Sequence, residues 1–555
     1  MLLFRTLIFE AIELLCGNNC RSYTFFVRGF GYALFIFKEE FEMKLKKALP
    51  IIIIALSLIM ALSACGGKDT VQPVDTNGIT NDSGSDATED NNNGESIPKE
   101  ESLAYELNED KLGYTVVGIG SWKKAEVEIS EYKDLPVTAI AGGAFKDCAG
   151  LEKITISDSV TSIGDFAFEG CTKLTAIDIP DSVIHIGENA FKNTGISNDE
   201  EKWEKGYLYV DNCLVSVDIK SIKKYEIKNG TRVLASKVFY ERADIDAIAL
   251  PDSLKSIGSF AFFGCTGLKS ITVPDGVTVI GESAFKGCTS LSALTLGENV
   301  ATIGNEAFRG CVGLTDVVIS DKVTDIGDFA FDRCSGIEEL TISNSVKNIG
   351  YYAFYGCTNL TRVNMGNGLE NLGHSAFENC ISLTGVTLPD SVKKIGNWAF
   401  YGCSELTSVV ISDGVTYIGT SAFYGCEKLT GIEIPDSVKE LGASAFEGCS
   451  ALASVTIGNG VEKIGDAAFK NCIALTSATL PDSVKTLGAS AFEGCSTLAS
   501  VTIGNGVEKI GDAAFKNCAA LTTVNYTGTE EQWGKISKSG VGIPENITVN
   551  YSYTA

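Results

Sequence analysis

The sequence predicts a repeat solenoid, in which short turns stack along one axis around a parallel β-sheet. An Ala-Phe pair, replaced by Val-Phe at Phe239, recurs every 23 residues from Phe239 to Phe515, and with the same step from Phe145 to Phe191. A cysteine stands three residues after this phenylalanine in fourteen of the sixteen turns. Such strict periodicity is typical of repeat proteins, whose units bury their apolar faces only by stacking on one another.

Within one turn, the pattern of residue types predicts each local element. The run Leu-x-x-Val-x-Ile at 406–411 has the period of two that indicates a short strand with one buried face. A turn-forming Ser-Asp-Gly follows it, and Val415 and Ile418 then return to the interior. We expect Gly419 to permit a sharp bend or a positive φ. The Ala-Phe pair that ends at Phe423 should close the opposite side of the turn in a helical turn.

The N-terminal part has the order of an export signal. Residues 43–64 begin with Met-Lys-Leu-Lys-Lys, continue as a short apolar stretch and end in Leu-Ser-Ala before Cys65. This tetrapeptide resembles a lipobox, which predicts a lipid on Cys65 and a lipoprotein signal peptide at 43–64. Because Met43 is well placed as the first residue of such a signal, we expect residues 1–42 to be a misassigned upstream leader. The polar residues 65–104 predict a flexible tether.

The remaining chain divides into a repeat body and its ends. Residues 135–526 are expected to form the solenoid, with an N-terminal cap at 105–134 and a C-terminal cap at 527–555, because exposed end turns need covering. An insertion near 196–219 breaks the period. Two apolar runs on either side of Asp211-Asn212 predict a β-hairpin there. We expect this hairpin to project from the side of the solenoid as a lateral flap.

Composition argues against several functional classes. The 555-residue chain has a net charge of −25, which makes nucleic acid an improbable partner. His185 and His374 are its two histidines, and no nucleophile elbow, zinc-protease motif or phosphate loop is present. Carboxylates fall in repeated columns, whereas an active site needs a unique group. We therefore expect no enzyme, no catalytic residue and no cofactor.

Two repeated columns invite a metal or disulfide interpretation. The cysteine column could form disulfides, but side chains in a stacked column point the same way, so a ladder of buried free thiols is favoured. The Asp and Asn residues that follow each strand could bind calcium, but these residue types also stabilise turns by bonding to their own backbone. The turn interpretation is favoured, and no metal site is predicted.

The consensus Leu-x-x-Val-x-Ile-Pro-Asp-Ser-Val-x-x-Ile-Gly-x-x-Ala-Phe-x-Gly-Cys resembles the BspA-like, Treponema-type class of bacterial leucine-rich repeat. The resemblance covers about residues 135–526. It implies a parallel sheet on the concave face, with short helical turns or irregular segments on the convex face. It also implies a secreted or surface-attached protein that binds a partner.

A group of aromatic residues outside the core columns is the candidate binding site. Exposed Tyr and Trp are enriched at binding hot spots, although lateral packing between turns is the slightly favoured alternative. The resulting hypothesis is a monomeric surface lipoprotein, held at the membrane by its lipid, that binds a protein or glycan of a host or neighbouring cell. A passive scaffolding role and an enzyme carried by the insertion remain alternatives. The candidate residues are Tyr351, Tyr352, Tyr355, Trp398, Tyr401, Tyr417 and Tyr424.

Overall fold

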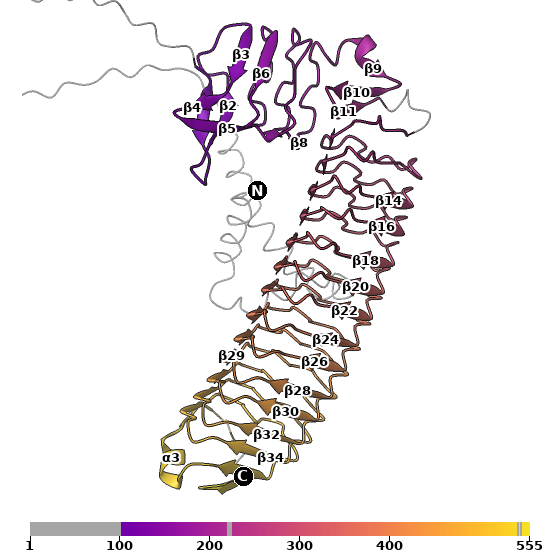
Figure 1. Ribbon diagram of the computed structural model, residues 1–555. Coiled ribbons are helices and arrows are strands. Elements are labelled where there is room, and N and C mark those ends of the chain that lie inside the picture. Colours follow the sequence, from indigo (N-terminus) through magenta and orange to yellow (C-terminus); the bar gives the residue numbers. More distant parts are fainter. Residues whose placement is uncertain (1–101, 219–224, 541–542, 544–546, 555) are drawn as a thin grey trace, which may run out of the picture. The chain divides into compact units, whose positions relative to one another are not determined.

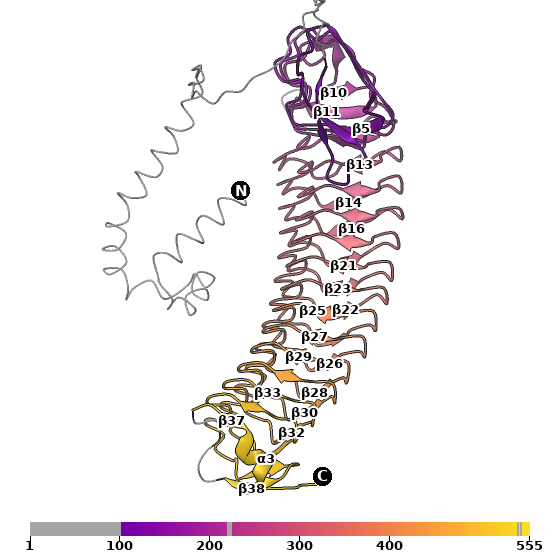
Figure 2. The same cartoon turned by 90° about the vertical axis from the view of Figure 1, so that its left-hand side faces the viewer.

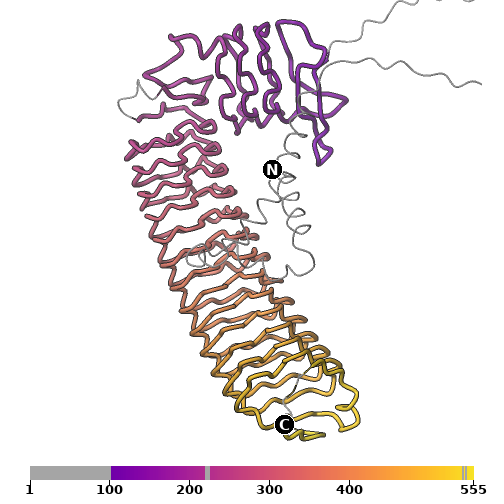
Figure 3. Tube along the Cα trace, turned by 180° about the vertical axis from the view of Figure 1, so that it is seen from behind, coloured from indigo at the N-terminus to yellow at the C-terminus, as the bar shows by residue number. Residues whose placement is uncertain are grey.

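The computed structural model describes residues 102–218, 225–540, 543 and 547–554. They form a parallel β-solenoid of about 19 turns with almost no helix, which confirms the predicted fold class (Figures 1 and 2). The trace in Figure 3 shows successive turns stacked one upon the next. The expected leader, the signal, the lipidation site Cys65 and nearly all of the tether lie outside the described residues.

The predicted strand of each turn forms a ladder that we call the Val-x-Ile ladder. Neighbouring strands pair in parallel with a step of 23 residues, for example Ser408 opposite Gly385. The ladder is divided into short sheets, and Figure 1 shows its strands along one side of the stack. Its strands are β3 (Glu126–Ile129), β6 (Lys153–Ile156), β14 (Ser270–Thr272), β16 (Ala293–Thr295), β18 (Asp316–Val318), β20 (Glu339–Thr341), β22 (Arg362–Asn364), β24 (Gly385–Thr387), β26 (Ser408–Val410), β28 (Gly431–Ile434), β30 (Ser454–Ile457), β32 (Ser477–Leu480), β34 (Ser500–Ile503), β36 (Thr523–Tyr526) and β38 (Thr548–Asn550).

A second ladder, the Ile-Gly ladder, runs along the opposite side of the turns. Each of its strands has only two residues, and neighbouring strands again pair in parallel. In most turns the second residue of the strand is a buried Ile or Leu. The sequence pattern did not predict these strands. They are β7 (Ser162–Ile163), β8 (His185–Ile186), β12 (Val233–Leu234), β13 (Ser256–Ile257), β15 (Val279–Ile280), β17 (Thr302–Ile303), β19 (Asp325–Ile326), β21 (Asn348–Ile349), β23 (Asn371–Leu372), β25 (Lys394–Ile395), β27 (Tyr417–Ile418), β29 (Glu440–Leu441), β31 (Lys463–Ile464), β33 (Thr486–Leu487), β35 (Lys509–Ile510) and β37 (Ser537–Lys538).

The Ala-Phe segment and its preceding glycine differ from the expectation. The segment is built of tight turns, so an irregular segment forms where a helical turn was expected. Gly419 has no positive φ. A Cβ on Gly419 would instead lie 2.6 Å from the backbone nitrogen of Asn397 in the preceding turn. The glycine is therefore needed for the close approach of two backbones.

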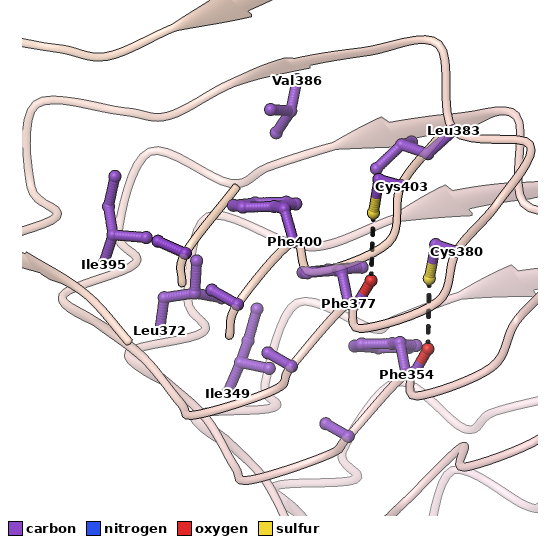
Figure 4. Close-up of a cluster of buried hydrophobic side chains, with 14 of the residues drawn as sticks. Ile349, Phe354, Leu372, Phe377, Cys380, Leu383, Val386, Ile395, Phe400 and Cys403 are labelled. Atoms are coloured by element: carbon purple, nitrogen blue, oxygen red, sulfur yellow. Dashed lines mark hydrogen bonds between the residues drawn. The ribbon is translucent and has the colours of Figure 1, made fainter. Parts of the chain in front are cut away.

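The core is a stack of identical side chains, one from each turn. Phe354, Phe377 and Phe400 lie face to face, with ring centroids 5.1 and 5.6 Å apart and planes within 8°. All three rings are fully buried, and Figure 4 shows them beside the leucine, isoleucine and cysteine columns. Because every turn adds the same apolar set to its neighbours, the core is continuous within each of two clusters, which divide at the hairpin of residues 207–217.

The cysteines form a column of free thiols, as predicted. The thiol of Cys403 donates a hydrogen bond to the Phe377 carbonyl at 3.3 Å, and Cys380 bonds to Phe354 in the same way (Figure 4). Among the described residues the cysteines are unpaired and buried, apart from the partly exposed Cys148. Burial raises the pKa of Cys265 and of Cys403 to about 12, so these thiols stay protonated.

We expect native alkylation at pH 8 to label Cys148 and to leave the rest of this column unmodified. The thiolate is the reactive form, and a thiol with a pKa of about 12 supplies almost none at this pH. Mass spectrometry of peptides labelled before and after denaturation measures the difference. Disulfides between successive turns in a non-reduced peptide map would contradict the prediction.

The Asp and Asn column stabilises turns in a way that the sequence did not suggest. Oδ1 of Asp275 accepts a hydrogen bond from the backbone nitrogen of Glu298 at 2.9 Å, and Asn344 accepts from Asn367 at 2.8 Å. The expectation that these side chains bond to their own backbone is wrong, because the next turn lies within reach. Within the described ranges, no cluster of three or more His, Cys, Asp or Glu side chains is arranged to hold a metal ion.

The insertion forms the predicted hairpin, but it is not a lateral flap. β10 (Tyr207–Val210) and β11 (Cys213–Val217) pair antiparallel, and β11 then pairs in parallel with β12 of the following turn. Leu208 and Cys213 are buried. Both strands are rich in apolar residues, which an exposed flap would leave in water. The hairpin therefore lies within the stack (Figure 1).

A buried arginine joins the turns on either side of the hairpin. Nη1 of Arg232 donates to the Val183 carbonyl at 3.1 Å, and Nη2 donates to the Ile179 carbonyl. The guanidinium also lies 3.3 Å from Asp181, yet the Arg232 residue is only 7% exposed. A side chain thus replaces backbone pairing where the regular period is interrupted.

The strands of both expected caps pair with the end turns. β2 lies in parallel beside β5, β1 adds an antiparallel edge, and β37 and β38 extend the two ladders. No helix in the described part of the chain is long and apolar enough to cross a membrane. The remaining elements are β1 (Ala104–Leu107), β2 (Tyr114–Gly118), β4 (Glu131–Tyr132), β5 (Leu135–Ile140), a 3-10 turn (Glu200–Lys202), β9 (Trp203–Glu204) and α3 (Glu530–Lys535).

Candidate functional site

Two residues in each regular turn have a positive φ, one on either side of the core phenylalanine. In the turn of Phe400 they are Trp398, with φ of 57°, and Gly402, with φ of 70°. The later position is Gly or Asn in most turns, as this backbone region favours. The earlier position is aromatic in five turns, at Phe166, Phe260, Phe329, Tyr352 and Trp398.

These aromatic residues are not explained by the needs of the turn. A bulky residue with positive φ costs about 1–2 kcal/mol of backbone strain relative to the ordinary conformation. Ser and Ala occupy the same position in the C-terminal turns, as at Ser444 and Ala467. Because serine and alanine adopt the same backbone at this position, the turn itself does not require a ring there, which points to a role of the aromatic side chains outside the fold.

The position two before the phenylalanine and the position one after it lie on a common surface. The rings of Tyr352 and Tyr355 are 5.8 Å apart, and those of Phe260 and Phe263 are 5.9 Å apart. We call this surface the aromatic edge. In the turns that follow the hairpin it consists of Tyr240, Phe260, Phe263, Phe329, Tyr352, Tyr355, Trp398, Tyr401 and Tyr424, all of them partly exposed.

Stacking between turns fixes several rings of the aromatic edge. Phe329 stacks on Tyr352 with centroids 4.9 Å apart and planes within 6°. Tyr401 stacks on Tyr424 at 4.7 Å and 8°. Partial burial, and then the nearby Tyr424, raise the pKa of Tyr401, so its hydroxyl remains protonated at neutral pH. Rigid, half-exposed rings lose little conformational entropy when a partner covers them.

Five of the seven predicted residues lie on the aromatic edge: Tyr352 and Tyr355 in one turn, Trp398 and Tyr401 two turns further on, and Tyr424 in the turn after that. The stripe expected through Tyr355, Tyr401 and Tyr424 is interrupted by Glu378, which occupies the intervening turn.

Two predicted residues lie off the edge. Tyr351 is 53% exposed and its ring lies 5.1 Å from that of His374. Tyr417 belongs to β27 in the Ile-Gly ladder, and in the part of the chain described here it makes no ring contact with the others.

Sequence reasoning missed four members of the edge, Tyr240, Phe260, Phe263 and Phe329. Tyr240 stacks on Phe263 with centroids 4.8 Å apart. Counting positions from the core phenylalanine, instead of looking for local density of aromatics, would have found all four.

Cations accompany the N-terminal half of the aromatic edge. Lys237 lies 5.5 Å from the ring of Tyr240, and Arg309 lies 5.2 Å from that of Phe329. Arg309 also contacts Asp332, whose side chain is only 2% exposed, with 2.8 Å between Nε and Oδ2. Burial raises the pKa of Asp332, against the opposing effect of the two nearby arginines. The edge thus offers ring faces, which attract cationic and aromatic partner groups, and cations, which attract aromatic rings and anionic groups.

The repeated turn, the two parallel ladders and the apolar core together define a leucine-rich repeat solenoid. This chain belongs to the BspA-type leucine-rich repeat family. The family model matches residues 136–201, 216–338, 324–453 and 416–537.

Several solved structures are similar to this chain. A leucine-rich repeat protein from Bacteroides ovatus is 27% identical, with 81% of this chain and 98% of that chain covered and a TM-score of 0.44. A leucine rich cell surface protein from Faecalibacterium prausnitzii is 25% identical over 79% of this chain and 97% of that chain, with a TM-score of 0.29. A leucine-rich repeat protein from Eubacterium ventriosum is 24% identical over 64% of this chain and 95% of that chain, with a TM-score of 0.37. None of the curated proteins matches this chain.

Proposed function

We propose that this chain is a monomeric, lipid-anchored cell-surface protein that binds a partner protein of a host or neighbouring cell through its aromatic edge. It acts without catalysis and without a cofactor. The observation that carries the proposal is the placement of rings at Phe260, Phe329, Tyr352 and Trp398, where serine or alanine serves the turn equally well in other repeats.

The proposed anchor is a diacylglyceryl group on Cys65. The motif before this cysteine supports it, and the polar segment 65–104 would hold the solenoid away from the membrane. The BspA-type family, to which the chain belongs, typically includes secreted and surface-attached proteins. An aromatic edge that is exposed along the solenoid suits contact with another macromolecule.

The two other hypotheses have less support. A passive scaffold does not account for the aromatic edge, although it accounts for the uniform core. An enzyme carried by the insertion would need accessible chemical groups in the hairpin, yet Leu208, Val210 and Cys213 are buried in the stack. Partner binding is therefore the function that the geometry supports best.

We expect the double substitution Trp398→Ala and Tyr401→Ala to weaken partner binding at least tenfold. Large aromatic anchors commonly supply about 2 kcal/mol or more each at a hot spot. Neither side chain belongs to the core columns, so folding should be retained. Adhesion of cells that display the variant to host or community cells measures the effect, and a pull-down from the same material identifies the partner.

The matched control is Ser444→Ala with Glu447→Ala, which changes the same two positions two turns further along the chain. A second control removes 46 residues from the nearly identical segments 437–477 and 483–523. Both controls should bind normally. Normal binding by the aromatic variant, together with lost binding after the deletion, would place the site elsewhere. A glycan in the captured material would replace the protein partner.

A further inference from the structure

A pocket lies where the hairpin interrupts the regular stack, and none of its lining residues belongs to the aromatic edge. It has a volume of about 190 Å³. Figure 1 shows β9, β10 and β11 between the turn of β8 and the turns that follow. Unlike the repeated surfaces, this pocket has a lining that occurs once in the described chain. The lining residues are Asn189, Phe191, Lys192, Asn193, Ser197, Asn198, Trp203, Leu208, Val215 and Ser216.

In a regular turn, three backbone N–H groups around the core phenylalanine donate to the next turn. Ala467 donates to Ala489 at 2.7 Å, Phe469 to Ala491 at 2.8 Å and Asn471 to Glu493 at 2.8 Å. These bonds satisfy the donors at the Ala-Phe side of the solenoid. The same three positions occur in every turn. Where their N–H groups are hydrogen-bonded to the next turn, the two turns are in contact along the Ala-Phe side.

At the pocket, these three donors have lost their partners. The equivalent residues are Asn189, Phe191 and Asn193, and across the residues that the structure describes their backbone N–H groups make no hydrogen bond. Phe191 is 2% exposed, so its N–H is a buried donor. The following turn still pairs with this one near the Ile-Gly ladder, where Ser236 donates to Ile186 at 2.8 Å. The stack is therefore open on one side only, where it presents a row of unpaired donors.

The side chains of the pocket add further donors and an aromatic surface. The amides of Asn193 and Asn198 make no hydrogen bond within the described ranges. The indole nitrogen of Trp203 donates to the Ser197 carbonyl at 3.0 Å, which fixes the ring. Lys192 is the one charged residue in the lining, and its Nζ lies 3.4 Å from Glu169, outside the pocket.

This combination selects a class of ligand. Unpaired N–H groups beside a cation, with no carboxylate in the lining, favour a bound carboxylate. A fixed indole favours the apolar face of a sugar ring, and free amides can both donate to and accept from hydroxyl groups. The volume is below the roughly 300 Å³ at which drug-sized sites begin, so a single ring is the largest group that it suits.

We propose that this pocket binds one terminal acidic sugar of a glycan, with the carboxylate on the backbone N–H groups and Lys192 and the ring against Trp203. The chain's net charge of −25 does not prevent this, because salt screens charges beyond about 10 Å. The proposal is independent of the aromatic edge and of the protein partner proposed above.

The chain contains its own matched control for this site. Lys470 and Asn471 occupy the same two positions as Lys192 and Asn193, but they lie in a regular turn in which the N–H of Asn471 is paired. Both asparagines have a positive φ, of 56° and 60°, so glycine can replace either without backbone strain. The two double variants are Lys192→Gln with Asn193→Gly, and Lys470→Gln with Asn471→Gly.

Calorimetric titration with glucuronic acid, N-acetylneuraminic acid and glucose tests the proposal. We expect at least one of the acids to bind with a Kd on the order of 1 mM, and glucose to bind at least tenfold more weakly. The variant at 192 and 193 should lose at least tenfold in affinity for the acid, and the variant at 470 and 471 should lose none. Equal thermal unfolding of the two variants checks the fold.

Three results would overturn the assignment. They are no binding of either acid to the unmodified protein, equal binding of glucose, or unchanged affinity in the variant at 192 and 193. The Trp398→Ala and Tyr401→Ala variant should bind the acid normally. This last comparison separates the sugar pocket from the proposed function, because each can fail without the other.

Discussion

Replacing Phe377 by alanine is expected to destabilise the solenoid by about 3–5 kcal/mol, the usual range for a large aromatic side chain removed from a core. The Phe377 ring is fully buried and stacks on a neighbour at each face, at 5.1 and 5.6 Å. The cavity cannot be filled easily, because the turns above and below are held by two ladders. Since turns stabilise only their neighbours, the substitution should also divide unfolding into two steps.

Urea unfolding followed by circular dichroism measures both effects, and hydrogen exchange locates the weakened turns. Tyr355→Ala is the matched control, because it removes a partly exposed aromatic ring from the adjacent turn without opening the core. It should leave the unfolding midpoint close to that of the unmodified protein. Equal midpoints for the two variants would show that the phenylalanine stack does not hold the turns together.

Replacing Arg232 by alanine is expected to lower the free energy of unfolding by about 3 kcal/mol, since hydrogen bonds to charged groups contribute about 1.5–3 kcal/mol each. Its guanidinium donates to the carbonyls of Ile179 and Val183, and the variant would leave both without a protein donor. The ion pair with Asp181 adds little, because that carboxylate is 99% exposed. The loss should be concentrated at the hairpin, where the regular period is broken.

Limited proteolysis is the direct measurement, with new cleavage expected between the turn of β8 and the turn of β12. Arg362→Ala provides the comparison, because Arg362 pairs with Glu339 on the surface with 71% of its side chain exposed. That variant should be cut like the unmodified protein. Cleavage of the Arg232 variant spread evenly along the solenoid would contradict a local role.

Periodicity in the sequence was enough to predict the stack, the strand of each turn, the buried columns and the unpaired cysteines. The reason is physical. Each turn repeats the same apolar positions, and a short turn can bury them only against a copy of itself. The step of 48 residues between Phe191 and Phe239 also revealed the insertion and its hairpin. Local residue types carry this information without reference to neighbouring turns.

Contacts between turns decided what the pattern left open. The need for Gly419, the bonds made by Asp275 and the pairing of the Ile-Gly ladder all depend on a backbone 23 residues away. The aromatic edge emerged because the folded turn brings the positions two before and one after the core phenylalanine onto one surface. The pocket beside Trp203 exists because the hairpin leaves three N–H groups without the next turn. The sequence by itself determined the structure of one turn and its repetition along the chain. The surfaces available for binding depend on the distances between turns, and those distances are set only when the turns stack.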